Sequence, residues 1–312
     1  MIQTMLNRTL WVLAAACTLL SCSTRASEPA TKAEKALAAM YDPASRHVVV
    51  VAHRGDWRNY PENTLGAIES VIRMGVDMVE IDLKLTKDSV LVLSHDRTCN
   101  RMTTGKGDIS TMTYDSLATF NLRRAHNVVI PGTRITTFQE ALELCKDRIL
   151  INVDQGYQYY DLVVRLSDAL DMTDQILIKG KKARDVVARE MAGSRMMYMP
   201  IIDIQKPAGK ELFAQYEAWY DQTGEKPLAY EVCFSRLDEE VEECCRKVLA
   251  QGSKLWINTL WASLCGGYDD DAAFEGNPDE VFGKILDLGA SIIQTDRPEL
   301  LIGWLKKQGR RQ

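Results

Sequence analysis

The sequence lacks three features that would each indicate a particular class of protein. It has no long run of Lys or Arg and a net charge of -5, whereas a nucleic-acid groove needs clustered basic residues. The apolar run from Leu10 to Leu20 has 11 residues, and a membrane-spanning helix needs about 20. Internal repeats and low-complexity segments are also absent. We therefore expect a globular protein with no nucleic-acid partner and no obligate protein partner, although it can still bind one small anionic molecule.

Cysteine is present but says little about function. Two of the eight cysteines, Cys17 and Cys22, fall in the N-terminal segment, and the spacing of the other six matches no zinc-binding pattern. Cys145 and Cys233 lie in apolar helix-like and strand-like runs, where buried free thiols are the usual outcome. We expect no disulfide that the fold requires.

The N-terminal segment has the pattern of an export signal. Arg8 gives a weakly positive start, and the apolar run that follows is too short to span a bilayer. The run ends in a Leu-Leu-Ser-Cys box that resembles the cleavage site of bacterial lipoproteins, which implies that Cys22 becomes lipidated; ordinary secretion with a cut near Ala26 is the alternative. We expect a signal peptide over 1–22, a tether leading into a short helix over 23–45, and an exported lipoprotein of the bacterial cell envelope.

From residue 46 onward the chain alternates strand-like and helix-like runs. The strand-like runs cover 48–52, 78–82, 149–153, 175–178, 196–202, 228–233, 254–258 and 291–295. The helix-like runs cover 64–74, 137–145, 160–170, 182–191, 210–221, 238–249, 278–288 and 298–307. Eight strand-then-helix units in series predict a parallel sheet that closes into a barrel. We therefore predict an α/β fold, a (β/α)8 TIM-type barrel over residues 46–312.

The second strand-like run continues into a β-hairpin. Residues 78–85 and 90–95 alternate apolar and polar side chains around a four-residue connection, which is typical hairpin spacing. If the turn centres on residues 87 and 88, Asp82 lies opposite Leu93 and Glu80 lies opposite His95. The period of two places Glu80, Asp82 and Lys84 on one face. The return strand is then an excursion from the barrel, and residues 97–136 form an insertion.

Polar side chains occupy the ends of four successive barrel strands. They are His53 and Arg54 after strand one, Glu80 and Asp82 on strand two, Asp154 at the end of strand three and Lys179 at the end of strand four. In parallel barrels the carboxyl ends of the strands meet at one end of the barrel, here called the mouth, where the chemistry takes place. The sequence therefore predicts a functional site at the mouth.

Five short motifs resemble, in order, the signature of the glycerophosphodiester phosphodiesterase family. They are Ala52-His53-Arg54-Gly55, Pro61-Glu62-Asn63-Thr64, Glu80-Ile81-Asp82-Leu83, Thr86-Lys87-Asp88 and Val92-Leu93-Ser94-His95-Asp96. Residues 130–131, 136–140 and 295–298 are similar to later parts of that signature, so the resemblance covers about residues 48–305. It implies a TIM-type barrel, a divalent cation, and hydrolysis of glycerophosphodiesters to glycerol 3-phosphate and an alcohol.

The residues fit the chemistry that this resemblance implies. Glu80, Asp82 and Asp154 are oxygen donors of the kind that hold one divalent cation, Mg²⁺ or Ca²⁺. Arg54 can bind a phosphate oxygen with two hydrogen bonds and bridge to Glu80. His53 and His95 can flank the phosphorus as general base and general acid, in an order that the sequence leaves open. The expected family route is attack by a hydroxyl of the substrate itself, which gives a cyclic phosphate that water then opens.

The chain departs from the family pattern on strand three. Where the family has a Glu followed two residues later by a Lys, this chain has Asp154 and Gly156. The usual phosphate-binding lysine is therefore absent, and we expect Lys179 on the next strand to supply that charge.

Several other residues have both a functional and a structural interpretation. Asn63 begins a helix as its N-cap or, with Glu62, braces the metal site. Trp256 resembles a family tryptophan near the glycerol pocket, where it would bind substrate, or else it packs in the core. His47 and His126 lie in surface segments where we expect no function.

Two other functions remain compatible with the sequence. One is a phosphoinositide-phospholipase-like lyase, which would stop at the cyclic phosphate. The other is a lipoprotein that binds phosphodiesters without catalysis, which the pair of histidines disfavours because a binding protein needs no acid and base.

Overall fold

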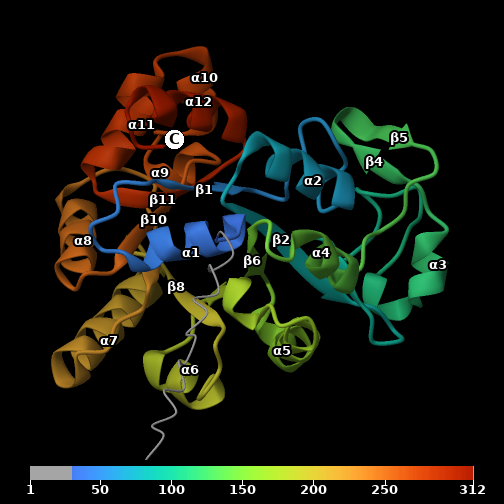
Figure 1. Ribbon diagram of the computed structural model, residues 1–312, viewed down its shortest axis with the longest axis horizontal. Helices are drawn as coiled ribbons and strands as arrows, with labels where there is room; N and C mark the ends of the chain where they lie inside the picture. The colour runs from blue at the N-terminus through green and yellow to red at the C-terminus, as the bar shows by residue number, and fades with distance from the viewer. Residues whose placement is uncertain (1–29, 312) are drawn as a thin grey trace, which may run out of the picture. The chain divides into compact units, whose positions relative to one another are not determined.

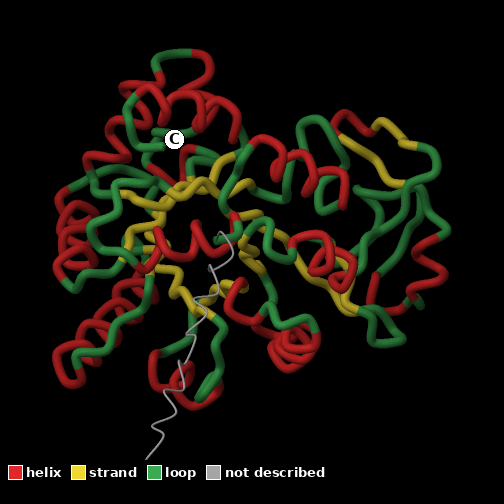
Figure 2. The backbone as a smooth tube through the Cα atoms, viewed as in Figure 1, coloured by secondary structure: helices red, strands yellow, loops and turns green. Residues whose placement is uncertain are grey.

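Eight parallel strands form a closed ring in the computed structural model, which describes residues 30–311. They are β1 (Val49–Ala52), β2 (Met78–Leu85), β6 (Leu150–Asp154), β7 (Ile176–Gly180), β8 (Met197–Asp203), β9 (Ala229–Cys233), β10 (Lys254–Asn258) and β11 (Ala290–Thr295). Each strand pairs in parallel with the next, and β1 closes the ring by pairing with both β2 and β11 (Figure 2). The predicted barrel is confirmed. The predicted signal peptide and Cys22 lie outside the described residues.

Helices surround the ring on its outer side (Figure 1). They are α2 (Leu65–Met74), α4 (Phe138–Cys145), α5 (Tyr160–Ala169), α6 (Arg184–Glu190), α7 (Pro207–Thr223), α8 (Glu239–Ala250), α11 (Pro278–Asp287) and α12 (Pro298–Lys307). Two short helices that the sequence analysis did not anticipate, α9 (Ala262–Cys265) and α10 (Asp270–Glu275), lie between β10 and α11. None of the described helices is long and apolar enough to cross a bilayer.

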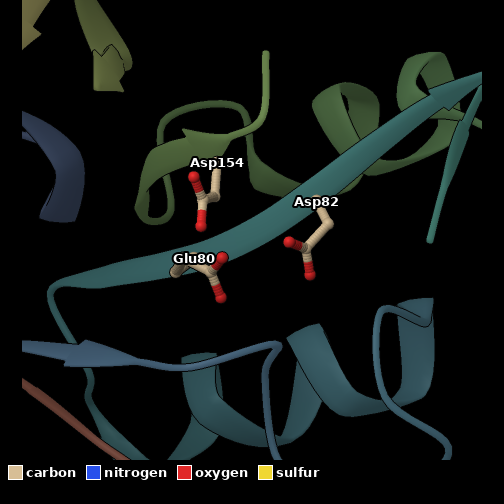
Figure 3. A group of neighbouring side chains, drawn as sticks. All are labelled: Glu80, Asp82 and Asp154. Carbon is tan, nitrogen blue, oxygen red and sulfur yellow. The ribbon is translucent and has the colours of Figure 1, made fainter. Parts of the chain in front are cut away.

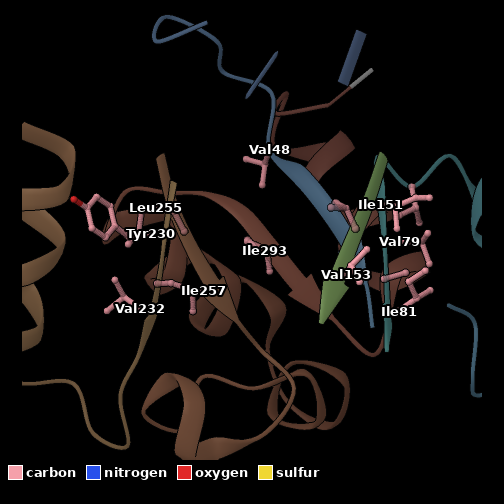
Figure 4. Packing of buried hydrophobic residues seen from close by; sticks show 14 of the residues in the cluster. Val48, Val79, Ile81, Ile151, Val153, Tyr230, Val232, Leu255, Ile257 and Ile293 are labelled. Atoms are coloured by element: carbon pink, nitrogen blue, oxygen red, sulfur yellow. The ribbon is translucent and has the colours of Figure 1, made fainter. Parts of the chain in front are cut away.

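The core separates into an outer and an inner layer because side chains alternate along each strand. Val79, Ile81 and Val153 belong to the cluster between the strands and the helices (Figure 4). Met78, two positions before Glu80, belongs to a separate apolar cluster inside the ring. The inner face of β2 is therefore apolar at its start and acidic near its end.

Helix α1 (Lys32–Tyr41) lies across the end of the barrel opposite the mouth (Figure 1). Its buried residues Ala33, Ala36 and Met40 join the apolar cluster inside the ring. A reciprocal capping box between Thr31 and Glu34 begins the helix. The compact unit starts at Thr31, so the predicted short helix lies within this unit and covers the lower core of the barrel.

The return strand of the hairpin is β3 (Leu91–Leu93), and its register differs from the prediction by one residue. Leu83, and not Asp82, lies opposite Leu93. Thr86 donates its backbone N–H to the Val90 carbonyl at 3.0 Å, which leaves a three-residue loop. Ser89 in this loop has a φ of 63°, the left-handed residue that a three-residue hairpin loop requires. The count from a two-residue turn therefore shifted the predicted pairing.

The predicted insertion after the hairpin folds into a small unit of its own. It contains α3 (Tyr114–Ala118) and an antiparallel pair, β4 (Leu122–Arg124) and β5 (Val128–Ile130). Val92 on the hairpin packs with the insertion residues Cys99, Ile109, Leu117 and Ile135. The insertion is thereby fixed to the hairpin beside the mouth.

The six cysteines of the described residues are buried, free thiols. Burial raises the pKa of Cys245 to about 12, so this thiol stays protonated and unreactive at neutral pH.

Candidate active site

Three carboxylates meet at the mouth of the barrel. Glu80 and Asp82 point inward from β2, and the parallel pairing of β2 with β6 sets Asp154 beside Asp82. One oxygen from each carboxylate lies within 4.8 Å of the others, and Figure 3 shows the three groups turned toward a common space. Glu80 and Asp82 are buried, while Asp154 is partly exposed. The structure thus brings together the three residues that the sequence predicted as metal ligands.

The electrostatics of this cluster favour a bound cation. Burial, together with the charges of Asp82 and Asp154, raises the pKa of Glu80 well above its ordinary value. Burial also acts to raise the pKa of Asp154, but the charge of Lys179 and a backbone hydrogen bond from Gln155 outweigh it, so that this pKa is lowered. Clustered buried carboxylate oxygens are the donor set that Mg²⁺ and Ca²⁺ prefer. The residues present therefore fit a divalent cation.

The loop after β1 holds the acidic residues of β2 in place. The backbone N–H of Arg54 donates to Glu80 at 2.8 Å, and Gly55 follows at a φ of 73°, where a Cβ would lie 2.9 Å from Ala67. Asn63 donates its side-chain amide to Asp82 at 2.9 Å and accepts the Asp82 backbone N–H at 3.1 Å. Glycine at this turn therefore lets the loop approach α2 closely.

Asn63 is not the N-cap of α2. Thr64 caps the helix by accepting the Ala67 N–H, and Asn63 itself has a φ of 57°. Its two hydrogen bonds to Asp82 match the alternative prediction, in which Asn63 braces the metal site.

The Arg54 side chain lies among acids other than the predicted one. Its guanidinium donates to Glu62 at 3.1 Å and lies 3.4 Å from Asp82, whereas only its backbone reaches Glu80. Glu62 also accepts two hydrogen bonds from Arg101 of the insertion, at 2.7 and 2.8 Å. Burial acts to raise the pKa of Glu62, but Arg101 and Arg54 outweigh it, so that this carboxylate stays charged. The Arg54 Nε has no hydrogen-bond partner within the described residues.

His53 is oriented by Asp296, which follows β11. The His53 Nδ1 lies 2.8 Å from an Asp296 oxygen, and Trp57 donates its indole N–H to the same oxygen at 2.6 Å. Asp270 accepts the Asp296 backbone N–H at 2.6 Å. This arrangement fixes the imidazole, because a carboxylate on Nδ1 selects the tautomer with a free Nε2 lone pair.

His95 has an equivalent partner on the other side of the mouth. Its Nδ1 lies 2.8 Å from Asp96, and Arg101 donates to both oxygens of Asp96 at 2.8 and 3.1 Å. The predicted pairing of Glu80 with His95 is wrong, because β3 ends at Leu93 and the chain leaves the ladder before His95. Arg101 also donates to Glu62 at 2.7 Å, so hydrogen bonds connect His95 to the residues of the mouth.

Lys179 is more enclosed than a phosphate-binding lysine would be. It is 5% exposed, and its Nζ lies 3.1 Å from Glu231 and 3.8 Å from Asp154. Lys179 is therefore paired with acids inside the barrel, and the prediction that it binds the substrate phosphate is not supported by its position.

Trp256 does not lie where the predicted substrate contact would require. Its side chain is fully buried within the apolar cluster inside the barrel, so it is a core residue. Trp261 is the tryptophan at the mouth: it is 47% exposed, and its ring centre lies 6.1 Å from that of His53.

The sequence analysis missed four residues of this site: Asp296, Glu231, Arg101 and Trp261. Asp296 belongs to the motif at residues 295–298, and its position directly after the last barrel strand is the signal that could have found it. Glu231 was detectable as an acid on the inner face of β9, two residues before the strand end. Arg101 lies in an insertion without strand periodicity, and no sequence pattern distinguished it.

The chain resembles known proteins over most of its length. Residues 53–206 match the model of the glycerophosphoryl diester phosphodiesterase family, and residues 198–305 match a domain of unknown function. A glycerophosphodiester phosphodiesterase of Caldanaerobacter subterraneus is 27% identical over 270 residues, covering 84% of this chain and 99% of that protein. One from Bacillus altitudinis is 31% identical over 137 residues, covering 41% of this chain and 56% of that protein.

Solved structures share the fold. A glycerophosphoryl diester phosphodiesterase from Parabacteroides distasonis superposes with a TM-score of 0.71 at 22% identity, covering 88% of this chain and 92% of that one. An Oleispira antarctica phosphodiesterase in complex with the product sn-glycerol-3-phosphate gives a TM-score of 0.60 at 19% identity, covering 82% of this chain and 96% of that one.

Proposed function

The chain belongs to the glycerophosphoryl diester phosphodiesterase family, and from this premise we propose that it hydrolyses glycerophosphodiesters to glycerol 3-phosphate and an alcohol. The observation that carries the proposal is the arrangement of Glu80, Asp82 and Asp154 within 4.8 Å of one another, at a mouth that also holds two imidazoles. A phosphodiester is an anion, so its cleavage needs charge neutralisation, a base and an acid together.

In this proposal Glu80, Asp82 and Asp154 hold one divalent cation, Mg²⁺ or Ca²⁺. When bound, the cation supplies positive charge to the phosphate oxygens and lowers the pKa of a bound hydroxyl. Asn63 keeps Asp82 in its orientation through two hydrogen bonds. Arg54, whose buried Nε lies 3.4 Å from Asp82 but makes no hydrogen bond within the described residues, adds a second positive charge for the phosphate.

The two histidines transfer the protons. Asp296 and Asp96 each occupy the Nδ1 side of one imidazole at 2.8 Å, which leaves Nε2 to face the substrate. One imidazole takes the proton of the attacking hydroxyl, and the other returns a proton to the leaving alkoxide. Attack by the neighbouring glycerol hydroxyl gives a cyclic phosphate, which water opens when the roles of the two rings reverse.

The direct test is a turnover screen of glycerophosphocholine, -ethanolamine, -glycerol and -inositol, with and without chelator. We expect turnover with Mg²⁺ or Ca²⁺ and loss of turnover with chelator. His95→Ala should lower kcat by about 10²–10⁴-fold. His126→Ala, which changes an exposed histidine of the insertion, is the matched control and should leave kcat unchanged.

The products separate this proposal from the two alternatives. Accumulation of a cyclic phosphate without glycerol 3-phosphate would support the lyase. Absence of turnover on all four substrates, with retained binding, would support the non-catalytic binding protein.

We also propose that the protein is exported and held at a membrane of the bacterial cell envelope by a lipid on Cys22. This proposal rests on the apolar run and the Leu-Leu-Ser-Cys box. In membranes washed at high salt, which weakens electrostatic contacts, Cys22→Ser should move the protein from the membrane fraction to the soluble exported fraction, with turnover of soluble substrates unchanged. Unaltered partition of Cys22→Ser would contradict lipidation.

A further inference from the structure

The end of the barrel opposite the mouth carries a cluster of basic side chains. They border a cleft of about 670 Å³ between α1, the segment before β1, and the end of α12. Lys35, Arg46, Lys306 and Arg310, hereafter the basic cluster, come from three different segments of the chain. Three of the four are exposed and Arg310 is partly exposed.

The positive charge of the basic cluster is uncompensated. Asp77, the one acid that lines the cleft among the described residues, already contacts His47 at 3.1 Å and pairs with Arg311. Within residues 30–311, none of the four basic-cluster side chains forms an ion pair, although most other exposed arginines do, such as Arg195 with Asp171 at 2.9 Å. This surface is therefore locally positive on a chain whose net charge is -5.

Helix capping explains only one member of the cluster. Lys306 lies in the last turn of α12, where a cation interacts favourably with the helix dipole. Lys35 lies near the start of α1, Arg46 precedes β1, and Arg310 follows α12. Three of the four charges therefore need another explanation.

We propose that the basic cluster binds the anionic headgroups of a phospholipid membrane. The segment outside the described residues enters the fold at α1, which borders the cleft. Cys22 precedes Ala30 by eight residues, which span at most about 26–29 Å of extended chain. A lipid on Cys22 would therefore keep this end of the barrel close to the bilayer. One lipid group together with a basic surface is the combination that gives stable membrane binding.

Membrane contact through the basic cluster would also set the orientation of the enzyme. The basic cluster and the mouth lie at opposite ends of the barrel, so contact through the cluster directs the mouth away from the bilayer. Soluble phosphodiesters then reach the site without passing between protein and membrane. The proposal does not depend on the identity of the substrate, and its test uses no turnover.

The test is co-sedimentation of the full chain carrying Cys22→Ser, which removes any lipid, with vesicles. We expect binding to phosphatidylcholine vesicles that contain about one third phosphatidylglycerol, weak binding to pure phosphatidylcholine, and loss of binding at high salt. Adding Lys35→Glu and Arg310→Glu should weaken binding to anionic vesicles at least about 25-fold, because each basic residue near an anionic surface contributes about fivefold.

The matched control reverses two exposed lysines away from the cluster, Lys87 and Lys106. Lys87→Glu with Lys106→Glu changes the net charge equally and should leave vesicle binding nearly unchanged. Equal loss of binding in both double variants would mean that net charge alone acts, and would overturn the proposal. Binding of the parent chain that ignores phosphatidylglycerol would also overturn it. Circular dichroism on each variant confirms that the fold is kept.

A second observation concerns the missing phosphate-binding lysine, and the inference from it rests on the proposed function. Gly156, at the position where the family pattern has Lys, offers no room: a Cβ there would lie 2.4 Å from Val153 Cγ1. Lys179 is paired with Glu231. Lys84, by contrast, lies on the same face of β2 as Glu80 and Asp82, two residues nearer the strand end.

We infer that the ammonium group of Lys84 binds the substrate phosphate, in place of the lysine that the family pattern has at residue 156. Its Nζ donates to the side-chain oxygen of Gln155, and the Gln155 amide nitrogen lies 3.3 Å from Asp82. Gln155 therefore places the Lys84 ammonium one side chain away from a metal ligand. Within the described residues no carboxylate forms an ion pair with Lys84, so its charge is available to a substrate.

Lys84→Met should raise KM for the substrate and the inhibition constant of glycerol 3-phosphate by about 10- to 100-fold, as expected for a lost hydrogen bond to a charged group. Lys87→Met, on the exposed turn of the same hairpin, is the control and should change neither constant. An active enzyme in which Lys84→Met leaves both constants unchanged would overturn the inference. If the parent chain shows no turnover, the proposed function has failed. The inference about Lys84 can still be tested, because calorimetric titration with glycerol 3-phosphate in the presence of Mg²⁺ measures the Kd of each variant. If Lys84→Met does not fold, Lys84→Gln replaces it in the same measurements.

Discussion

His53 is held by hydrogen bonds that cross three separate segments of the chain. Asp270 on α10 accepts hydrogen bonds from Thr259, Thr295 and the backbone of Asp296. Asp296 in turn contacts His53 at 2.8 Å. The orientation of the imidazole therefore depends on the buried Asp270 as well as on Asp296.

This dependence predicts the effect of Asp296→Asn. The amide keeps the size of the side chain but can present its N–H to His53, which then adopts the wrong tautomer. We expect kcat to fall by about 10²–10⁴-fold with little change in KM or in melting temperature. Turnover and thermal melting of the purified variant test this. A variant that keeps normal kcat would show that His53 needs no carboxylate.

Asp270 gives the fold a pH dependence. Burial raises the pKa of this carboxyl to about 7, against about 4 in an unfolded chain. The folded state therefore favours the protonated form, so the stability that this group contributes is present below about pH 4 and is lost as pH rises through about 7. Between pH 5 and 8 the free energy of unfolding should fall by about 2–3 kcal/mol more than in Asp270→Asn. Urea unfolding of both proteins at the two pH values tests this, and parallel pH profiles would contradict it.

At the residue scale, the sequence predicted side chains that sit in contiguous motifs. His53, Arg54, Glu80 and Asp82 were found because each lies within a few residues of the end of a barrel strand. Glu231 and Asp296 were missed because each acts by pairing with a residue on or directly after another strand, Lys179 and His53 respectively. No local pattern encodes a contact between strands that are far apart in the sequence. Trp256 was misplaced because the alternation of β10 shows that it points inward but not how deep it lies.

At the scale of elements, the eight strands and eight helices were predicted within a few residues, because hydrophobic periodicity is strong in a barrel. The register of the hairpin, by contrast, was predicted incorrectly, by one residue. A single left-handed residue, Ser89, lengthens the turn by one residue and moves every pair of the ladder. Sequence periodicity gives the face of each residue on a strand, but the turn geometry sets the partner.

Ser89 therefore offers a test of the turn. It is exposed and has a φ of 63°, a conformation that glycine adopts without strain. Ser89→Gly should stabilise the fold by about 0.5–1 kcal/mol, and Ser89→Val should destabilise it by about 1–2 kcal/mol. Because the side chain is exposed, neither change disturbs the core. Urea unfolding measures both values, and a reversed order of the two variants would contradict the observed turn.

At the scale of the molecule, the barrel has two ends with different chemistry. The inner faces of the strands are apolar next to α1, where Met78 and Leu150 lie, and charged at the mouth, where Glu80, Asp154 and Lys179 lie. The apolar end stabilises the ring. The charged end contains buried like charges, which destabilise the folded chain when no cation is present.

Metal binding should therefore stabilise the whole domain. A ligand that binds only the folded state at about 100 times its Kd adds about 2.7 kcal/mol, which corresponds to a rise in melting temperature of roughly 4–5 °C for a chain of this size. Mg²⁺ or Ca²⁺ should give this rise in the unmutated protein. Glu80→Gln should remove the response and, because it relieves repulsion among the three carboxylates, should raise the melting temperature of the metal-free protein. Glu143→Gln, an exposed change on α4, should keep the full response. If neither ion moves the melting temperature of the unmutated protein, or if Glu80→Gln still responds, the three carboxylates do not hold the metal.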